Sequence, residues 1–164
     1  MNILLHMPHV SLEVPDEFYE GLTISKTLFN KYNLEMTDLG IDILFKDLNC
    51  IKIIPKYSRL YCDVERFLDD DMEIMSKYGQ GVIYTHTYDG LLFHNHDDDY
   101  KNRVIKYYNE KILNKIIDKI KEMGYSYQIN YPYNGSLVPN CIYTKEIKGN
   151  ICSIMLEINK RIYL

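Results

Sequence analysis

The chain opens with the stretch Asn2-Ile3-Leu4-Leu5-His6-Met7-Pro8-His9. An apolar run of this length, ended by a proline, is typical of a short buried strand. In open α/β sheets, ligands bind beyond the carboxyl ends of the strands. The stretch therefore predicts a strand over residues 2–7 and places the imidazole of His9 where a catalytic or metal-binding group would be useful.

The rest of the chain alternates between short apolar runs and segments with helical periodicity. Further strands are expected at residues 51–55, 82–85, 125–131 and 151–158. Helices are expected at residues 23–34, from 37 or 38 to 48, and 98–123. Residues 57–67 are expected to begin as a strand or extended segment. Residues 68–78 are expected to form a surface helix or loop. This alternation favours one α/β domain over residues 1–164, with a mixed, largely parallel sheet flanked by helices.

Bulk properties exclude several classes of partner. The net charge of −4 gives no basic footprint for nucleic acid. No window approaches the roughly 18 consecutive apolar residues of a membrane span. The four cysteines are scattered and form no Cys-x-x-Cys, which favours free thiols and a cytoplasmic location. The oligomeric state is left open.

Glu157 stands among apolar neighbours in the last predicted strand, Met155-Leu156-Glu157-Ile158. A carboxylate inside a buried strand is costly unless it is paired or functional. Low-dielectric surroundings raise the pKa of a carboxyl group, which suits a general base. The alternatives are an ion pair with an arginine and a side chain on the solvent face of an edge strand.

Charged residues gather between residues 59 and 66, where Arg59, Asp63, Glu65 and Arg66 lie close in sequence. The fork of an arginine suits a substrate carboxylate. The alternative is an internal network of ion pairs. His9 has a similar pair of interpretations, because a neutral imidazole is a good zinc ligand but also a common loop residue.

A second group of histidines precedes the helix expected at residues 98–123. It consists of His86, His94 and His96, followed by the acidic run 97–99. The histidines lack the His-x-x-x-His spacing of a helical metal site. A solvated turn is therefore favoured over a metal site, with the acidic run at the positive end of the helix dipole.

Five blocks occur in order from one end of the chain to the other. They are Met7-Pro8-His9-Val10-Ser11, Thr37-Asp38 with Asp42-Ile43-Leu44-Phe45, Arg59-Leu60 with Asp63-Val64-Glu65-Arg66, Asn130-Tyr131-Pro132-Tyr133-Asn134-Gly135, and Glu157-Ile158-Asn159-Lys160-Arg161-Ile162-Tyr163. In that order they resemble the Pro-His-Ser-Gly, Thr-Asp…Val-Asp-x-Leu-Tyr, Arg-Leu…Asp-x-Asn-Arg, Asn-x-Pro-Tyr-x-Gly and Glu-Ile-Asn-Arg-x-Leu-Tyr motifs of the N-formylglutamate amidohydrolases. One block alone says little, whereas five in order are fairly specific.

The resemblance implies a shortened fold similar to that of zinc-dependent exopeptidases, and hydrolysis of a small acidic N-acyl amino acid. It also implies one zinc ion that polarises the acyl carbonyl and activates a water. His9 and Asp38 become candidate zinc ligands and Glu157 the general base. The candidate binders of substrate carboxylates are Arg59, Arg66 and Arg103.

One family motif has no counterpart here. The family carries a strand that ends in Asp-x-His-Ser before the Asn-x-Pro-Tyr turn, and no segment of this sequence matches it. A catalytic zinc normally has three protein ligands plus water. His9 and Asp38 are candidates for two of them, and the third ligand is not identified. One alternative is a non-catalytic or truncated relative that binds a small acidic ligand. Another is a plain interaction domain, in which His9, Glu157 and the arginines would not converge.

Overall fold

A computed structural model describes residues 4–122 and 124 of the chain. The predicted strands at 125–131 and 151–158, and Glu157 with them, lie outside the described residues. The described part combines helices with a small parallel sheet, which confirms the α/β class at that level. In this part of the chain no helix has the length and apolar character needed to span a membrane.

The sheet consists of β1 (Leu4–His6) and β2 (Ile51–Ile53), which pair in parallel with Leu4 opposite Ile51. The Met7 N–H donates to the Ile53 carbonyl at 3.0 Å and continues the ladder by one residue. β1 confirms the expected strand at residues 2–7 over its central part, and β2 confirms the one at residues 51–55 over its first three residues. Because the strands are parallel, the chain leaves both of them at the same edge of the sheet.

Helix α1 (Lys26–Met36) confirms the helix expected at residues 23–34, shifted by two to three residues. Ser25 caps it, since its side chain accepts a hydrogen bond from the Leu28 N–H. Its buried face carries Phe29, Tyr32 and Asn33, of which Phe29 packs into the aromatic core. The helix thereby fixes the segment that follows it, which leads to Asp38.

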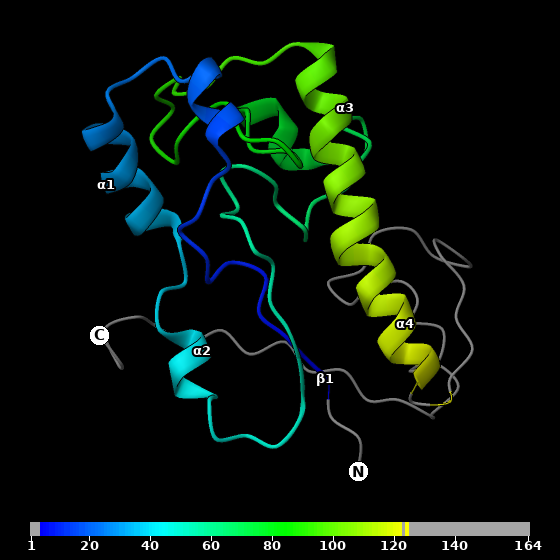
Figure 1. Cartoon of the computed structure of the whole chain (residues 1–164). Coiled ribbons are helices and arrows are strands. Elements are labelled where there is room, and N and C mark those ends of the chain that lie inside the picture. Colours follow the sequence, from blue (N-terminus) through cyan, green and yellow to red (C-terminus); the bar gives the residue numbers. More distant parts are fainter. Residues whose placement is uncertain (1–3, 123, 125–164) are drawn as a thin grey trace.

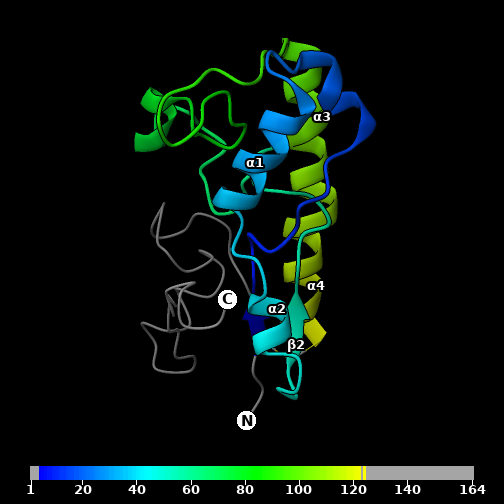
Figure 2. The same cartoon turned by 90° about the vertical axis from the view of Figure 1, so that its left-hand side faces the viewer.

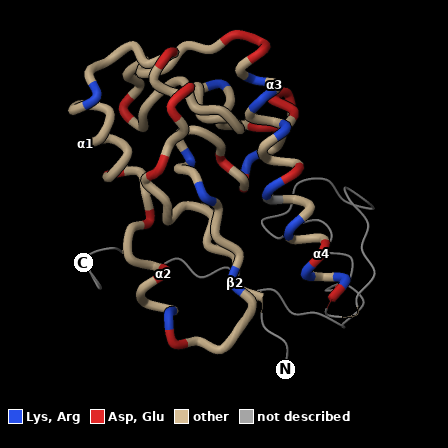
Figure 3. Tube along the Cα trace, in the orientation of Figure 1, with Lys and Arg blue, Asp and Glu red and all other residues tan. Residues whose placement is uncertain are grey.

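Three consecutive helical segments form a rod along one side of the molecule, opposite α1 in Figure 1 and again distinct in Figure 2. They are α3 (Asp98–Tyr107), the π-helical segment η3 (Tyr108–Leu113) and α4 (Asn114–Glu122). Figure 3 shows acidic and basic residues interspersed along this rod. Gly124 follows with a φ of 83°, as a helix-ending glycine does. The helix expected at residues 98–123 is confirmed as far as it is described, and the π-helical segment was not expected.

The helix expected from residue 37 or 38 to 48 is largely wrong. Only α2 (Ile41–Leu44) is helical, and Gly40, with a φ of 86°, precedes it in place of a Thr37 or Asp38 cap. A left-handed residue cannot continue a right-handed helix, so the chain turns before α2 begins. The apolar side chains of Ile43 and Leu44 are 64% and 47% exposed, so this short helix does not pack them into the core of the described residues.

The strand expected at residues 82–85 is also wrong, and residues 57–67, expected to begin as a strand or extended segment, form no strand. Tyr84 forms only an isolated bridge with Gln80, and the segment wraps around the carbonyl of Gly79. That carbonyl accepts from both Thr85 and His86, because Gly79 has no side chain to block the approach. From Ser58 onward the chain forms turns. The acidic stretch 68–78 ends in the short 3-10 helix η2 (Ile74–Tyr78).

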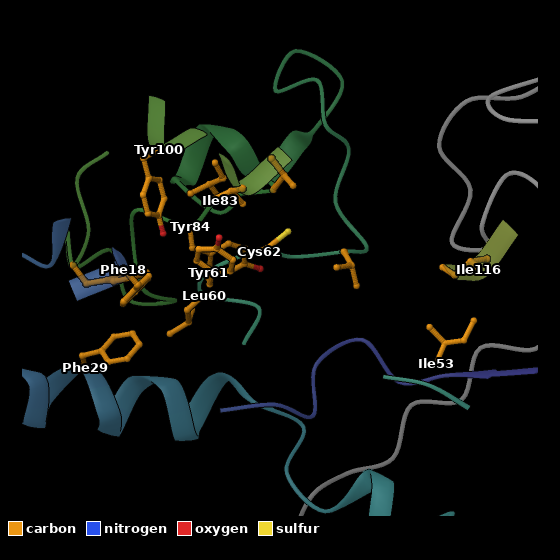
Figure 4. Close-up of a cluster of buried hydrophobic side chains, with 14 of the residues drawn as sticks. Phe18, Phe29, Ile53, Leu60, Tyr61, Cys62, Ile83, Tyr84, Tyr100 and Ile116 are labelled. Atoms are coloured by element: carbon orange, nitrogen blue, oxygen red, sulfur yellow. The ribbon is translucent and has the colours of Figure 1, made fainter. Parts of the chain in front are cut away.

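The core is dominated by aromatic side chains. Phe18, from the 3-10 helix η1 (Asp16–Gly21), is fully buried against Phe29 and Phe93, with ring centroids at 4.8 and 6.4 Å. Figure 4 shows Phe18 and Phe29 at one end of the buried cluster and Ile53 of β2 at the other. The large hydrophobic area of these rings stabilises the half of the molecule that lies away from the sheet.

Candidate active site

The parallel pairing of β1 and β2 brings two distant segments together. From β1 the chain turns through Pro8 to His9, and from β2 it leads to a tight turn that begins at Ser58. The Ser58 N–H donates to the Glu13 carbonyl at 2.7 Å, which ties this turn to the loop after His9. Asp63, on the far side of the turn, thereby reaches His9 across 54 residues of sequence.

Asp63 is the centre of the cluster. It is fully buried, and its Oδ1 accepts from His9 Nε2 at 2.9 Å while its Oδ2 accepts from Arg59 at 2.8 Å and from the Tyr84 hydroxyl at 2.9 Å. Burial by itself raises the pKa of this carboxyl, but the hydrogen bond and charge of His9, together with Arg59, reverse this and hold the pKa well below its usual range. Asp63 is therefore a buried carboxylate that orients the groups around it.

His9 is held between two carboxylates. Its Nε2 faces Asp63, and its Nδ1 lies 3.6 Å from Oδ2 of Asp38. Burial lowers the pKa of the imidazole, but the hydrogen bonds to Asp38 and Asp63 outweigh burial and raise the pKa above its ordinary value. Since the ionised Asp63 only accepts, the proton stays on Nε2, and a neutral ring directs its Nδ1 lone pair toward the Asp38 side.

Asp38 reaches this place through its backbone. Its N–H donates to the His9 carbonyl at 2.7 Å, immediately after the buried Thr37 that ends α1. The Asp38 side chain is 49% exposed, whereas His9 is buried. The pair thus joins an interior imidazole to a carboxylate at the protein surface.

Arg59 and Arg66 both reach the cluster. Arg59 donates to Asp63 and to the Tyr84 hydroxyl, at 2.8 and 3.0 Å, and Arg66 lies 3.6 Å from Asp63 and 3.7 Å from Glu73. Burial lowers the pKa of each guanidinium. Asp63 reverses the effect for Arg59, and Tyr84 and Asp63 do so for Arg66, so both remain charged. The Nε atom of each is buried without a hydrogen-bond partner among the described residues.

Glu65 borders the cluster on its exposed side. Its backbone N–H donates to Asp63 at 3.0 Å, and its Oε2 lies 3.7 Å from Nε2 of His9. Burial raises the pKa of Glu65, partly offset by the positive charge of His9. His6, on β1, has its pKa lowered to about 4 by burial and by the nearby His9, so it is uncharged at neutral pH.

Arg103 is not brought to this cluster by any described contact. It lies on α3, is half-exposed and pairs with Glu17, whose Oε2 is 2.7 Å from its Nε. The predicted base Glu157 lies outside the described residues. Of the six residues singled out from the sequence, four converge: His9, Asp38, Arg59 and Arg66.

The second histidine group contains a core residue, His94. His94 is fully buried, stacks on Phe18 with ring centroids 4.6 Å apart, and donates from Nε2 to the Phe18 carbonyl at 3.0 Å. Asp97 caps α3 by accepting from the Tyr100 N–H at 2.8 Å, so its predicted place at the helix start is confirmed. The segment was expected to be a solvated turn, which is wrong for His94 because aromatic packing draws the ring inside.

The side chains around His9 include possible ligands for a metal ion. His9 Nδ1 and Asp38 Oδ2 lie close enough to share an ion, and Asp63 behind the imidazole matches the carboxylate that commonly orients a metal-binding histidine. No group of three or more histidine, cysteine, aspartate or glutamate side chains suited to a metal occurs in the described part of the chain. Within that part, His9 and Asp38 are two candidate ligands, one fewer than the three protein ligands that a catalytic zinc normally has.

Two residues of the cluster, Asp63 and Tyr84, were not among the candidate site residues predicted from the sequence. Asp63 stood in a dense group of charges and in one of the five motif blocks, but nothing in the sequence singled it out from Arg59 and Arg66. Tyr84 was assigned to a strand, and nothing in its local sequence indicated that its hydroxyl would bind Asp63. Contacts between loops depend on the path of the chain, which hydrophobic periodicity does not describe.

Comparison with known proteins gives one match. A family model described as N-formylglutamate amidohydrolase matches residues 1–110, about two thirds of the chain. The match includes all four convergent residues, whereas the blocks at 130–135 and 157–163 lie beyond it. Neither the curated proteins nor the solved structures gave a match.

Proposed function

The chain belongs to the N-formylglutamate amidohydrolase family, and on this premise we propose that it is a metal-dependent amide hydrolase. Its proposed substrate is the N-acyl derivative of a small acidic amino acid, from which it removes the acyl group, formyl in the family's name. We further propose that residues 1–164 form one domain with a shortened fold similar to that of zinc-dependent exopeptidases.

His9 and Asp38 would hold the zinc ion, His9 through Nδ1. Asp63 fixes the imidazole by accepting from Nε2, which keeps the proton on that nitrogen. Zinc, when bound in such a site, supplies a Lewis acid for the acyl carbonyl and lowers the pKa of a water.

The other roles belong to the chain's own side chains. Glu157 would take the proton from the attacking water and pass it to the leaving amine. Arg59 and Arg66 would hold the α-carboxylate with guanidinium N–H groups not used by Asp63 and Tyr84. A role for Arg103 in substrate binding stays a prediction, and its ion pair with Glu17 gives it no support.

One observation carries this proposal: His9, Arg59 and Arg66 all meet at the buried Asp63. A plain interaction domain would leave these residues apart. Burying a carboxylate with two guanidinium groups and an imidazole is expensive, and such clusters are often retained for function.

A second candidate is a non-catalytic relative that binds a small ligand at the same place. Two observations favour it: no segment matches the family's Asp-x-His-Ser motif, and no third ligand is found among the described residues. This alternative predicts ligand binding without turnover.

The test is formate release from N-formyl amino acids by the full chain supplied with zinc. Glu157→Gln should lower kcat by roughly 10²–10⁴-fold while zinc content is unchanged, because the base is lost and the ligands remain. The exposed Glu122→Gln serves as the matched control and should retain full activity. Equal activity in the Glu157→Gln variant would overturn the assignment of the base, and binding without turnover would favour the second candidate.

A further inference from the structure

A polar cavity lies between residues 79–83 and helix α3. Its volume is about 210 Å³, which suits a ligand smaller than a drug-sized molecule. The polar side chains of its lining are those of Asp70, Ser76, Thr85, His96 and Lys101. Within the described part of the chain, the lining includes no member of the cluster around Asp63. The cavity is therefore a site of its own.

The two charged side chains of the lining form an ion pair. Nζ of Lys101 lies 2.8 Å from Oδ2 of Asp70, and the two side chains are 35% and 48% exposed. A partly exposed ion pair contributes little to stability, so this one can open at small cost. Burial and the charge of Lys101 lower the pKa of His96, whose ring is therefore neutral at pH 7. The cavity thus presents one negative and one positive group side by side.

Small and aliphatic residues form the rest of the lining. Val82 and Ile83 are both buried, and they give the cavity an apolar wall. Gly81 lies beside Asp70, and a Cβ atom at this position would come within 2.8 Å of Oδ1 of Asp70. The glycine therefore keeps the space next to this carboxylate open. A small apolar group of a ligand can lie there while its polar groups meet the two charges.

The adjacent opposite charges favour a zwitterionic ligand. An anion at Lys101 would face the carboxylate of Asp70, and a cation at Asp70 would face the ammonium of Lys101. A molecule with both an ammonium and a carboxylate avoids either repulsion. It replaces one ion pair with two charge-assisted contacts. An α-amino acid carries both groups on one carbon atom, at the spacing of neighbouring partners.

We propose that this cavity binds a free α-amino acid with a small side chain, holding its ammonium at Asp70 and its carboxylate at Lys101. An N-acyl amino acid lacks the ammonium, so the site would distinguish free amino acids from the substrates proposed above. The cavity also borders the segment that holds Asp63. The Val82 carbonyl accepts from the Asp63 N–H at 2.9 Å, and Tyr84 donates its hydroxyl to Asp63.

The test is calorimetry on the full chain with three matched probes. They are L-alanine, propionate, which lacks the ammonium, and ethylamine, which lacks the carboxylate. L-alanine should bind at least about tenfold more tightly than either of the others, because each of them loses one charge-assisted contact.

Variants of the lining locate the bound amino acid. Asp70→Asn and Lys101→Gln should each weaken the binding of L-alanine by about tenfold. Gly81→Ala keeps both charges but places a methyl group against Asp70, and it should weaken binding as well. The exposed Asp71→Asn and Lys106→Gln are the matched controls and should bind L-alanine as the wild type does.

The measurement is of binding, so it does not depend on the proposed hydrolysis. The site is overturned if L-alanine shows no saturable binding, or if propionate or ethylamine binds as tightly. It is also overturned if Lys101→Gln and Asp70→Asn bind L-alanine as the wild type does, since the amino acid would then lie elsewhere. Urea unfolding of each variant identifies those that are folded, and Gly81→Ala tests the site with both charges in place.

Discussion

Two buried histidines, His9 and His94, lie in regions of opposite character. His9 is 6% exposed and contacts carboxylates on both of its ring nitrogens. His94 is fully buried among Phe18, Phe93 and Tyr100, and its Nδ1 has no hydrogen-bond partner among the described residues. The difference shows that the partners of a buried imidazole, more than its burial, decide whether it is available for chemistry.

The pKa values follow the same division. The pKa of His9 is raised by its carboxylate partners despite burial, whereas burial lowers that of His94 to about 4. His94 is therefore a neutral core residue, and His9 belongs to a charged network. The two regions should therefore respond differently to substitution and to pH.

The largest effect is expected from Asp63→Ala. Removing this carboxylate leaves His9, Arg59 and Tyr84 without their common buried partner, which should lower the free energy of unfolding by about 3–5 kcal/mol in urea titrations. Asp118→Ala, at an exposed position of α4, is the control and should change stability by less than about 0.5 kcal/mol. A loss at Asp63 no larger than that of the control would show that the network is not stabilising.

His94 should make the fold sensitive to acid. Its pKa is about 4 in the folded chain and 6.5 when unfolded, so the unfolded state binds the proton first as pH falls. Stability is therefore complete above pH 6.5 and falls toward pH 4, by about 2 kcal/mol at pH 5 from this residue. Between pH 7 and pH 5 the free energy of unfolding should fall by about 2 kcal/mol less in His94→Gln than in the wild type. An identical fall in both chains would show that His94 does not cause the acid sensitivity.

Tyr84→Phe should have a smaller effect on the polar network. It removes one hydroxyl that donates to Asp63 and accepts from Arg59, and should reduce the free energy of unfolding by about 1.5 kcal/mol. The matched control is Tyr88→Phe, whose exposed hydroxyl contacts Glu35. If both variants unfold at the same urea concentration, the Tyr84 hydroxyl contributes nothing to holding Asp63.

The smallest effect is expected from Arg103→Gln. The side chain is half-exposed and its ion pair with Glu17 lies outside both buried regions, where such pairs contribute little. The unfolding midpoint should not move measurably, and a KM that changes by less than about twofold would show that Arg103 does not bind the substrate. A large rise in KM would instead restore Arg103 to the substrate site.

The sequence predicted the elements that rest on local signals. The strand before His9, the capped helix after Ser25 and the rod that begins at Asp98 all follow from periodicity and capping residues. The helix expected up to residue 48 failed because Gly40 takes a left-handed conformation. The strand expected at residues 82–85 is absent because this segment lies in a loop. Its apolar side chains are buried there without the backbone pairing of a strand.

The candidate site, too, was predictable only in part. His9, Asp38, Arg59 and Arg66 were identified by motif resemblance, and parallel strand pairing explains how His9 and the turn after β2 come together. Asp63 and Tyr84 gained their roles only from contacts across 54 and 21 residues. Contacts over such separations depend on the path of the whole chain, and a short window of sequence does not indicate them.

Zinc binding by variants of the two histidines shows whether His9, and not His94, holds a metal ion. The full-length wild-type chain, His9→Ala and His94→Gln would each be saturated with zinc, freed of excess metal and assayed for bound zinc. We expect close to one zinc per chain in the wild type and in His94→Gln, and loss of zinc in His9→Ala. Zinc retained by His9→Ala, or absent from the wild type under saturating conditions, would contradict this assignment.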